Sequence, residues 1–180
     1  LKVVELGVMP YEQALAKQHE YHLKVRQSSG ETEYLIVVQH PPVLTFGKHA
    51  TAKNLLLDAE SLKQKNIEII QTDRGGEVTA HEPGQLVIYP ILHLTKHQLS
   101  VRTFVDKLED SVIFALSQLG LQAARHSVNP GVWCENQKIC AIGIRIKQRV
   151  SMHGIALNIS NDLSTFDAIV PCGLLGFEVT

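Results

Sequence analysis

Residues 131–159 read GVWCENQKICAIGIRIKQRVSMHGIALNI, with three strand-like stretches and no helical stretch between them. The stretches cover 131–134, 139–146 and 152–159, where apolar residues run together or alternate, and the polar residues 135–137 supply a turn. Strands that follow one another along the chain, without regular alternation with helices, favour a mixed or antiparallel sheet over a doubly wound one. This segment therefore predicts an α+β fold.

The rest of the chain supplies more strands and a few helices. The best helical pattern covers 101–119, where apolar residues recur with helical spacing between a capping Ser100 and a terminating Gly120. Shorter helical patterns cover 10–25 and 58–65. Further strands are expected at 2–6, 34–39, 43–47, 67–71 and 122–125.

Size and composition indicate one ordinary globular domain. A chain of 180 residues with 44% hydrophobic and 19% charged side chains can bury a proper core. A formal net charge of −1 argues against binding to nucleic acid, which calls for a basic face. No apolar run approaches the roughly 20 residues that cross a bilayer, and no signal peptide is visible. We expect a single cytoplasmic domain over 1–180, monomeric, with no nucleic-acid or membrane partner.

The three cysteines lie in different surroundings. An odd number without a C-x-x-C pair fits reduced thiols better than a disulfide framework or a structural zinc site. Cys134 and Cys140 lie in apolar strands and are interpreted as packing residues. Cys172 differs because it lies between Pro171 and Gly173, which indicates a constrained turn.

Cys172 and Lys138 form a candidate catalytic pair. The thiolate is the nucleophilic form of cysteine, and a nearby ammonium stabilises it at neutral pH. Lys138 begins the alternating stretch 138–147. Whether the two side chains meet is left open by the sequence, and a buried, inert Cys172 is the alternative.

Two glycine-containing segments carry further polar candidates. Residues 74–85, RGGEVTAHEPGQ, have three glycines and a proline, which suit close approach by a ligand or a strand. Arg74 can pair with an anion and His81 can move a proton, but a tight hairpin with an exposed arginine and a core histidine is equally compatible. His153, beside Gly154, is interpreted as more probably structural than catalytic. Neither a P-loop nor a G-x-G-x-x-G motif is present.

Four collinear motifs closely resemble those of the lipoyl(octanoyl)transferases. They are RGGxxTxHxPGQLVxYPI (74–91), KIxAIGIRI (138–146), SMHGxALN (151–158) and IVPCG (169–173). The stretch HPPVLTFG (40–47) resembles an early motif of the same family. The similarity runs in order from about Tyr11 to Cys172, although lipoate and biotin ligases would share the Arg-Gly-Gly segment.

The resemblance implies a fold and an activity. The fold is the biotin/lipoate protein ligase catalytic domain, class II synthetase-like, with a mixed sheet and flanking helices. The activity moves an octanoyl group from octanoyl-acyl carrier protein, through a cysteine thioester, to a lysine of a lipoyl domain, as the first step of protein lipoylation. The acceptors would be the lipoyl domains of 2-oxoacid dehydrogenases and the glycine cleavage H protein. No metal or cofactor is implied.

Motif positions also imply site residues. Cys172 would be the acyl-thioester nucleophile, and Lys138 would lower the pKa of its thiol. The substrate-binding residues would be Arg74, Gly75, Gly76, Glu77, Val78, Thr79, Ala80, His81, Ala141, Ile142, Gly143, Gly154, Ile155 and Ala156. The glycines at 75, 76, 143 and 154 are expected to leave room for the eight-carbon chain. A basic patch for the acidic carrier protein is expected from Lys48, Arg145, Lys147 and Arg149.

Two departures and two alternatives accompany this interpretation. Glu82 stands where the family usually has glycine, which predicts altered turn geometry and an unusual charge near the site. The family normally continues beyond Thr180, so a C-terminal truncation is expected. An ATP-dependent lipoate-protein ligase on the same fold would not need Cys172, and a non-catalytic binding module would not need a reactive thiol.

Overall fold

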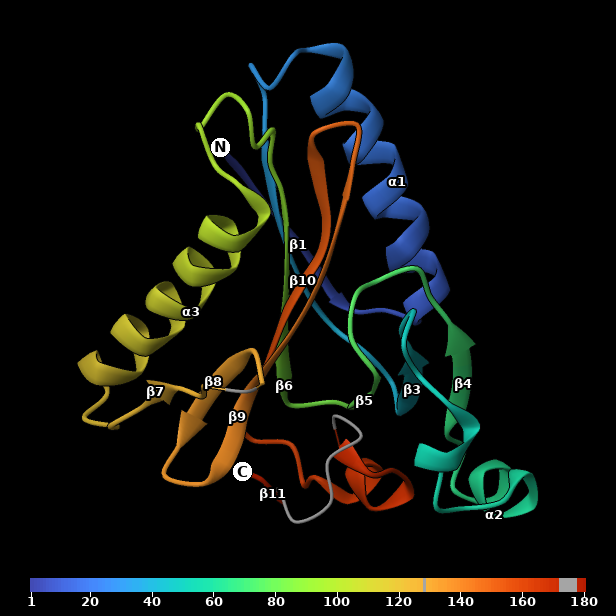
Figure 1. Ribbon diagram of the computed structural model, residues 1–180. Coiled ribbons are helices and arrows are strands. Elements are labelled where there is room, and N and C mark those ends of the chain that lie inside the picture. The colour runs from blue at the N-terminus through green and yellow to red at the C-terminus, as the bar shows by residue number, and fades with distance from the viewer. Residues whose placement is uncertain (128, 172–177) are drawn as a thin grey trace.

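The computed structural model describes residues 1–127, 129–171 and 178–180 and contains two sheets with flanking helices (Figure 1). The helices are α1 (Tyr11–Gln27), α2 (Ala59–Gln64) and α3 (Val101–Gln118), with 3₁₀ helices η1 (Ala52–Asn54) and η2 (Ser164–Ala168). The strands are β1 (Lys2–Val8), β2 (Tyr34–Gln39), β3 (Val43–Phe46), β4 (Glu68–Gln71), β5 (Val78–His81), β6 (Gln85–Ile91), β7 (Ala124–Arg125), β8 (Gly131–Cys134), β9 (Gln137–Lys147), β10 (Val150–Asn158) and β11 (Glu178–Val179).

The larger sheet has the strand order β1-β2-β6-β10-β9-β8-β7, with β11 paired to β9. The smaller sheet has the order β4-β3-β5. Strands β1 and β2, β3 and β4, and β9 and β11 pair in parallel, whereas the other pairs are antiparallel. The predicted α+β class with a mixed sheet is confirmed.

Strand β10 lies between β6 and β9, and all of its residues are buried. Helices α1 and α3 lie on opposite sides of this part of the sheet (Figure 1). Ala156 packs in the cluster that includes Ala14 of α1, whereas Ile155 and Leu157 pack in the cluster that includes Val112 of α3. Successive residues of a strand point to opposite faces, so covering both faces buries the whole strand, including its polar residues Ser151, His153 and Asn158.

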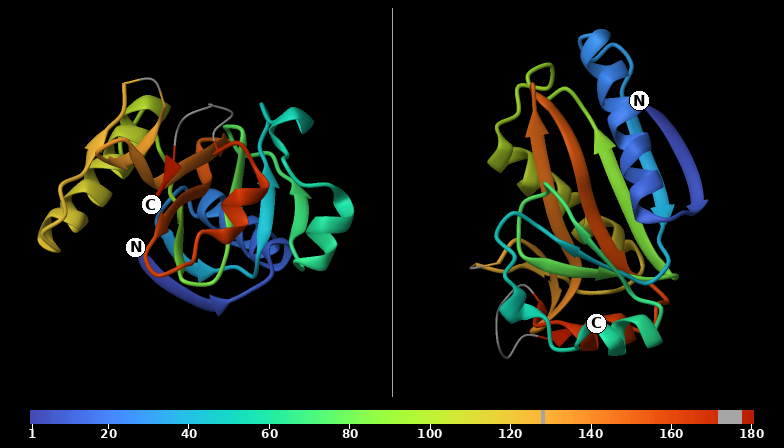
Figure 2. Two further views of the ribbon diagram at one scale, coloured as in Figure 1. Left: turned by 90° about the horizontal axis from the view of Figure 1, so that it is seen from below. Right: turned by 90° about the vertical axis from the view of Figure 1, so that its right-hand side faces the viewer.

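The helix ends follow the predicted capping residues. The Ser100 hydroxyl accepts a hydrogen bond from the backbone N–H of Thr103 at 3.1 Å, and Gly120 has φ +78° directly after the end of α3. Asp58 caps α2 in the same way, through the N–H of Ser61. Figure 2 shows α2 and η2 at the same end of the molecule, where Leu62 and Phe166 share one core cluster.

The segment 74–85 contains a feature that the sequence analysis did not predict. Strand β5 pairs with β3 in the smaller sheet, whereas β6 pairs with β2 and β10 in the larger one. The turn between them therefore carries the chain from one sheet to the other, and the alternative of a tight hairpin is wrong. Gly84, with φ +92°, is needed there because a Cβ would lie 2.7 Å from the backbone nitrogen of Asn161.

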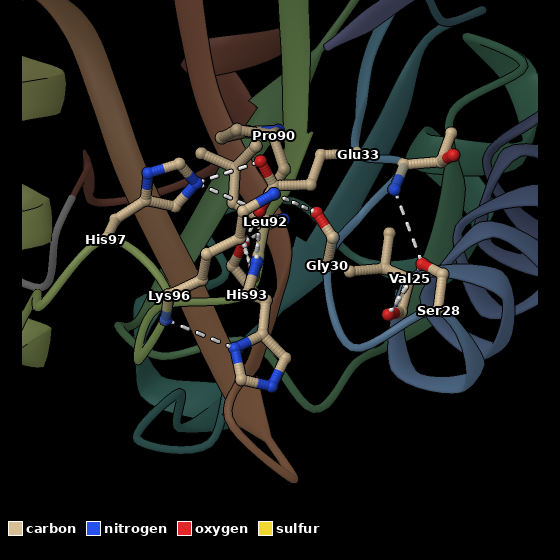
Figure 3. Close-up of polar contacts among 11 residues, drawn as sticks. Val25, Ser28, Gly30, Glu33, Pro90, Leu92, His93, Lys96 and His97 are labelled. Carbon is tan, nitrogen blue, oxygen red and sulfur yellow. Dashed lines mark hydrogen bonds and ion pairs between the residues drawn. The ribbon is translucent and has the colours of Figure 1, made fainter.

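A buried carboxylate joins the two loops at one end of the large sheet (Figure 3). Glu33 accepts a hydrogen bond from the backbone N–H of His93 at 2.8 Å and bonds to His97 Nε2 at 2.8 and 2.9 Å. Lys96 Nζ donates to the carbonyl oxygen of Gly30 at 2.6 Å. These bonds join the loop that follows β6 (residues 92–100) to the loop that follows α1 (residues 28–33).

Removal of this carboxylate should lower the stability of the fold. In Glu33→Ala, the part-buried N–H of His93 and the ring of His97 lose their buried acceptor, so we expect a loss of about 2 kcal/mol in the free energy of unfolding. Urea unfolding of the variant and of Glu31→Ala, an exposed neighbour, measures this loss. An equal midpoint for the two variants would contradict the anchoring role.

Candidate active site

A cavity of about 290 Å³ lies between strands β9 and β10 and the segment 74–81. It is lined by Tyr11, Arg74, Gly75, Gly76, Glu77, Val78, Thr79, His81, Val87, Tyr89, Val105, Asn129, Pro130, Lys138, Ala141, Ile142, Gly143, Ile144, His153, Gly154, Ile155 and Ala156. The structure thus brings together Lys138 and three predicted segments that are far apart in the sequence. Among the predicted pocket residues, Ala80 is the exception.

Ala80 faces away from the cavity. It is fully buried and packs with Leu44 and Phe46 in the core cluster of the smaller sheet. Its neighbours Thr79 and His81 line the cavity, and alternate residues of a strand point to opposite faces. The prediction of Ala80 as a pocket residue, taken from a continuous motif, is therefore wrong.

Two of the motif glycines, Gly143 and Gly154, make room for protein backbone and not for a ligand. A Cβ on Gly154 would lie 2.1 Å from the carbonyl oxygen of Ile88 on the neighbouring strand. A Cβ on Gly143 would lie 3.0 Å from the carbonyl oxygen of Gly75, whose N–H donates to Ile144 at 2.9 Å. The expectation that these glycines give clearance to an acyl chain is corrected: they let strands and the 74–76 segment approach closely.

Arg74 is a buried brace in the cavity wall and not an exposed cation. Its Nη2 donates to the carbonyl oxygens of Thr45 and, at 2.8 Å, of Glu77, and its Nη1 donates to that of Gly75 at 2.9 Å. Its Nε donates to the Thr45 hydroxyl at 3.2 Å. A buried charge is tolerated only with such hydrogen bonds, so Arg74 fixes the 74–77 segment against β3.

The hydrogen bonds of His81 define its tautomer. Gln85 Nε2 donates to Asn158 Oδ1 at 2.9 Å, so Gln85 Oε1 is the acceptor for His81 Nδ1–H at 2.7 Å. His81 Nε2 is then the acceptor that faces the Thr45 hydroxyl at 3.4 Å. Burial lowers the pKa of His81 well below its usual value, so the ring is neutral.

His153 lies at the cavity wall in an unusual backbone conformation. Its φ is +56°, within strand β10, and its N–H donates to Gln18 Oε1 at 2.7 Å. Its Nε2 bonds to Asp73 Oδ1 at 2.8 Å, while its Nδ1 lies 3.3 Å from the Tyr11 hydroxyl. Burial lowers the pKa of His153 to about 3, and the nearby positive charges of Arg74 and Arg145 act in the same direction.

Tyr89 and His40 form a second pair beside the same wall. His40 Nδ1 donates to the carbonyl oxygen of Met9 at 2.7 Å, so its Nε2 accepts from the Tyr89 hydroxyl at 2.8 Å. Burial lowers the pKa of His40 to about 4 and raises that of Tyr89 well above its usual value. Both side chains are therefore neutral at physiological pH.

Lys138 reaches the cavity because strand β9 carries a bulge. Val132 pairs with Cys140 and Trp133 pairs with Lys138, so the residue between them on β9 has no partner on β8. A bulge re-aims the next side chain, and Lys138 lines the cavity while Cys140 packs in the core.

The Lys138 ammonium is surrounded by oxygen acceptors and an aromatic face. Its Nζ donates to Asn129 Oδ1 and, at 3.1 Å, to the carbonyl oxygen of Pro130, and it lies 4.9 Å from the centre of the Trp133 ring. Gly131, with φ +137°, passes so close that a Cβ there would lie 3.1 Å from Lys138 Cε. Glu109 holds this turn by accepting the N–H of Gly131 at 2.9 Å.

The structure describes two of the three cysteines. Cys140 is fully buried, and burial raises the pKa of its thiol to about 12, so the prediction of a packing residue is confirmed. Cys134 is half-buried beside Trp133. Cys172 lies outside the described residues. Its neighbour Pro171 lines a second cavity, of about 10 Å³, together with Lys138 and Thr79.

Glu82 does not place an unusual charge in the cavity. Its side chain is buried, and it accepts hydrogen bonds from Asn161 Nδ2 at 3.0 Å and from the backbone N–H of Thr165 at 3.1 Å. The carboxylate therefore anchors the segment that contains η2. The expectation of an unusual charge near the site is wrong.

The predicted basic patch is weaker than its residue types suggest. Arg145 pairs with the Asp73 carboxylate, so its charge is largely compensated. Lys48, Lys147 and Arg149 are exposed. The expectation is therefore corrected for Arg145 and remains a prediction for the other three residues.

Several residues that line the cavity are not among those predicted from the sequence. They are Tyr11, Val87, Tyr89, Val105, Asn129, Pro130, Ile144 and His153. Tyr11 was expected only as part of a helix, and His153 was interpreted as structural. The signal available for His153 was its place in the SMHG motif beside a glycine that permits close strand packing.

The part of the chain that the structure describes contains no helix that is both long and apolar enough to cross a membrane.

Residues 10–180 match the family model described as the lipoyl protein ligase A/B catalytic domain. A protein named octanoyltransferase from Alkaliphilus metalliredigens is 46% identical over 100% of this chain and 83% of the relative. An octanoyltransferase from Maridesulfovibrio salexigens is 38% identical over 100% of this chain and 84% of the relative.

A solved structure described as lipoate-protein ligase A bound with ATP has a TM-score of 0.76 to this chain. The match covers 95% of this chain and 71% of the ligase, at 16% sequence identity. Likeness at this identity concerns the fold alone. It confirms the predicted biotin/lipoate protein ligase fold.

The role of Gly154 in strand packing can be tested by adding a single methyl group. In Gly154→Ala, the new Cβ would collide with the carbonyl oxygen of Ile88, so we expect a loss of about 2 kcal/mol or more in stability. Thermal unfolding measures this loss against Ala115→Gly, a glycine–alanine exchange on α3. A stable Gly154→Ala protein with altered chain-length preference would instead restore the role in acyl clearance.

Proposed function

The chain belongs to the octanoyltransferases of the lipoyl protein ligase A/B catalytic-domain family, and on that premise we propose that it acylates lipoyl domains through a thioester on Cys172. The donor is octanoyl-acyl carrier protein and the acceptor is a lipoyl-domain lysine. The observation that carries the proposal is an apolar cavity with Lys138 in its wall.

The walls of the cavity suit a fatty acyl chain. Apolar side chains supply much of the lining, including Val78, Val87, Ile142, Ile155 and Ala156. Burial of an eight-carbon chain, at about 0.8 kcal/mol per CH₂, contributes roughly 5 kcal/mol of binding. The polar groups Arg74 and His81 already have partners within the protein, so they do not need water in the cavity.

Lys138 provides the charge that activates the nucleophile. Pro171, which directly precedes Cys172, lines a small cavity together with Lys138, and this supports a position of the thiol near the ammonium. An opposite charge within a few ångströms favours the thiolate by Coulombic attraction. The Asn129 side-chain oxygen and the Pro130 carbonyl oxygen hold the Lys138 ammonium in position.

The reaction proceeds in two acyl transfers. The Cys172 thiolate attacks the carbonyl carbon of the octanoyl thioester, the bond to the carrier sulfur breaks, and the carrier thiol takes up a proton. The amine of the target lysine then attacks the enzyme thioester, loses a proton, and releases the Cys172 sulfur as the amide forms. A thioester is less stable than an amide, so the two transfers together lower the free energy and need no ATP.

An ATP-dependent lipoate ligase is the rival activity on this fold. The likeness to a ligase bound with ATP concerns the fold and does not distinguish the two activities. Two relatives at 46% and 38% identity, both named octanoyltransferase, favour acyl transfer. The IVPCG segment also supplies the thiol that a transferase needs and a ligase does not.

Intact mass spectrometry tests the proposed intermediate. Purified protein incubated with octanoyl-acyl carrier protein and no ATP should gain one octanoyl group, mapped to Cys172 and removed by hydroxylamine. Cys172→Ser should gain no thioester, whereas Cys134→Ser should behave as wild type. Octanoylation that requires ATP and free octanoate, and survives in Cys172→Ser, would support the ligase.

The pH dependence of thiol alkylation tests the role of Lys138. Removal of the ammonium raises the pKa of the Cys172 thiol, so in Lys138→Met the midpoint of Cys172 alkylation should move up by about 1 pH unit or more. Iodoacetamide rates at Cys172, followed by peptide mapping between pH 5 and 10, measure the midpoint. Lys147→Met, on the exposed end of β9, is the matched control, and an equal midpoint in both variants would refute the role.

A further inference from the structure

We propose that Tyr11, Tyr89 and His153 form a fixed stop at the end of the cavity remote from Lys138, which sets the longest acyl chain that the enzyme transfers. This inference rests on the proposed octanoyl transfer through Cys172. It assigns the choice of substrate length to three residues that the sequence patterns did not place in the pocket.

The pairing of β9 and β10 gives the cavity its direction. Ala156 pairs with Ala141, Gly154 with Gly143, and His153 with Ile144. Along β9, Lys138 and Ile144 lie six residues apart, and Ala141, which also lines the small cavity beside Lys138, lies about 10 Å from Ile144 at 3.3 Å per residue. Lys138 therefore lies at one end of the lining, and His153 and Ile144 lie at the other.

An acyl chain attached near Lys138 would extend toward the three rings. Thr79, Ala141 and Ala156 line both the main cavity and the small cavity beside Lys138, so they belong to the thioester end. Tyr89 lies on β6 two residues beyond Val87, which itself pairs with Ala156. The methyl end of the chain consequently points toward Tyr89, His153 and the Tyr11 ring that is bonded to His153.

Hydrogen bonds hold the three rings in place. The hydroxyl of Tyr11 bonds to His153 Nδ1, and His153 Nε2 bonds to Asp73. The hydroxyl of Tyr89 bonds to His40 Nε2, and the other nitrogen of His40 bonds to the backbone of Met9. Rotation of any one ring would break a buried hydrogen bond, so the rings form a wall that does not yield easily.

The rings also have no space behind them. Tyr11, Tyr89 and His153 are only 1–3% exposed. The ring of Tyr11 packs against those of His40 and His81, with centroids 5.1 and 5.8 Å away. A longer chain would have to displace this cluster, and close-packed interiors resist such displacement.

The faces of the same three rings are suited to contact with the terminal methyl group of the acyl chain. Their polar atoms have hydrogen-bond partners within the protein, and burial keeps both His153 and Tyr11 neutral, with the pKa of Tyr11 raised to about 12. A terminal methyl group can therefore pack on the ring faces without leaving a polar atom unpaired. The wall accepts a chain that ends there and excludes one that continues.

Substitution of Tyr11 tests the stop. Transfer rates are measured with octanoyl, decanoyl and dodecanoyl carrier protein for the wild type, Tyr11→Ala, Tyr11→Phe and Tyr21→Ala. In Tyr11→Ala, the ratio of decanoyl to octanoyl kcat/KM should rise roughly tenfold, as expected when two more CH₂ groups become buried. Tyr11→Phe retains the ring and should retain the wild-type ratio, as should Tyr21→Ala, a tyrosine of the same helix outside the cavity.

A photoreactive donor tests the same inference in the unmodified protein, whatever the stability of Tyr11→Ala. An octanoyl analogue with a terminal alkyl diazirine is loaded on Cys172 and irradiated, and the crosslinks are mapped by mass spectrometry. Crosslinks at Tyr11, Tyr89 or His153 are expected. Crosslinks confined to Val105, Asn129 or Pro130 would overturn the proposed direction of the chain.

Failure of the stop and failure of the proposed function give different results. A wild type that forms no octanoyl thioester would refute the function itself. A wild type that transfers octanoyl, with a folded Tyr11→Ala of unchanged chain-length ratio, would refute the stop alone.

Discussion

The buried guanidinium of Arg74 is the constraint on which the site depends. A charge removed from water must be matched by hydrogen bonds, and Arg74 finds them on Thr45, Gly75 and Glu77. These bonds fix the 74–77 segment against the smaller sheet, while the N–H of Gly75 bonds to Ile144 of the larger one. One side chain thereby sets the spacing of the two sheets, and the cavity is the space that this spacing leaves.

Local sequence patterns predicted the local structure well. The helix that became α3, with its caps at Ser100 and Gly120, and the long strands β9 and β10 all follow from periodicity and turn residues. The segments that the motif resemblance assigns to the pocket line one cavity with Lys138, Ala80 excepted, and their role in binding substrate stays a prediction. These features depend on neighbours in the chain or on motifs that can be read directly from the sequence.

Partners that are remote in sequence account for what was missed. The turn at Gly84 joins two sheets because β5 and β6 find different partner strands, and no local pattern distinguishes this from a hairpin. Gly154 faces the carbonyl of Ile88, so its purpose is set by another strand. Tyr11 lines the cavity because α1 packs against β10, through contacts such as that of Ala14 with the cluster of Ala156. In each case tertiary contact decided what local sequence left open.

The central position of β10 has a consequence for biosynthesis. Strand β6 needs β10 along its second edge, yet β10 leaves the ribosome long after β6 does. Until then the nascent chain presents an unpaired apolar strand, which is a template for aggregation. During synthesis, one edge of β6 therefore stays unpaired until the chain has grown by the roughly 60 residues that separate β6 from β10.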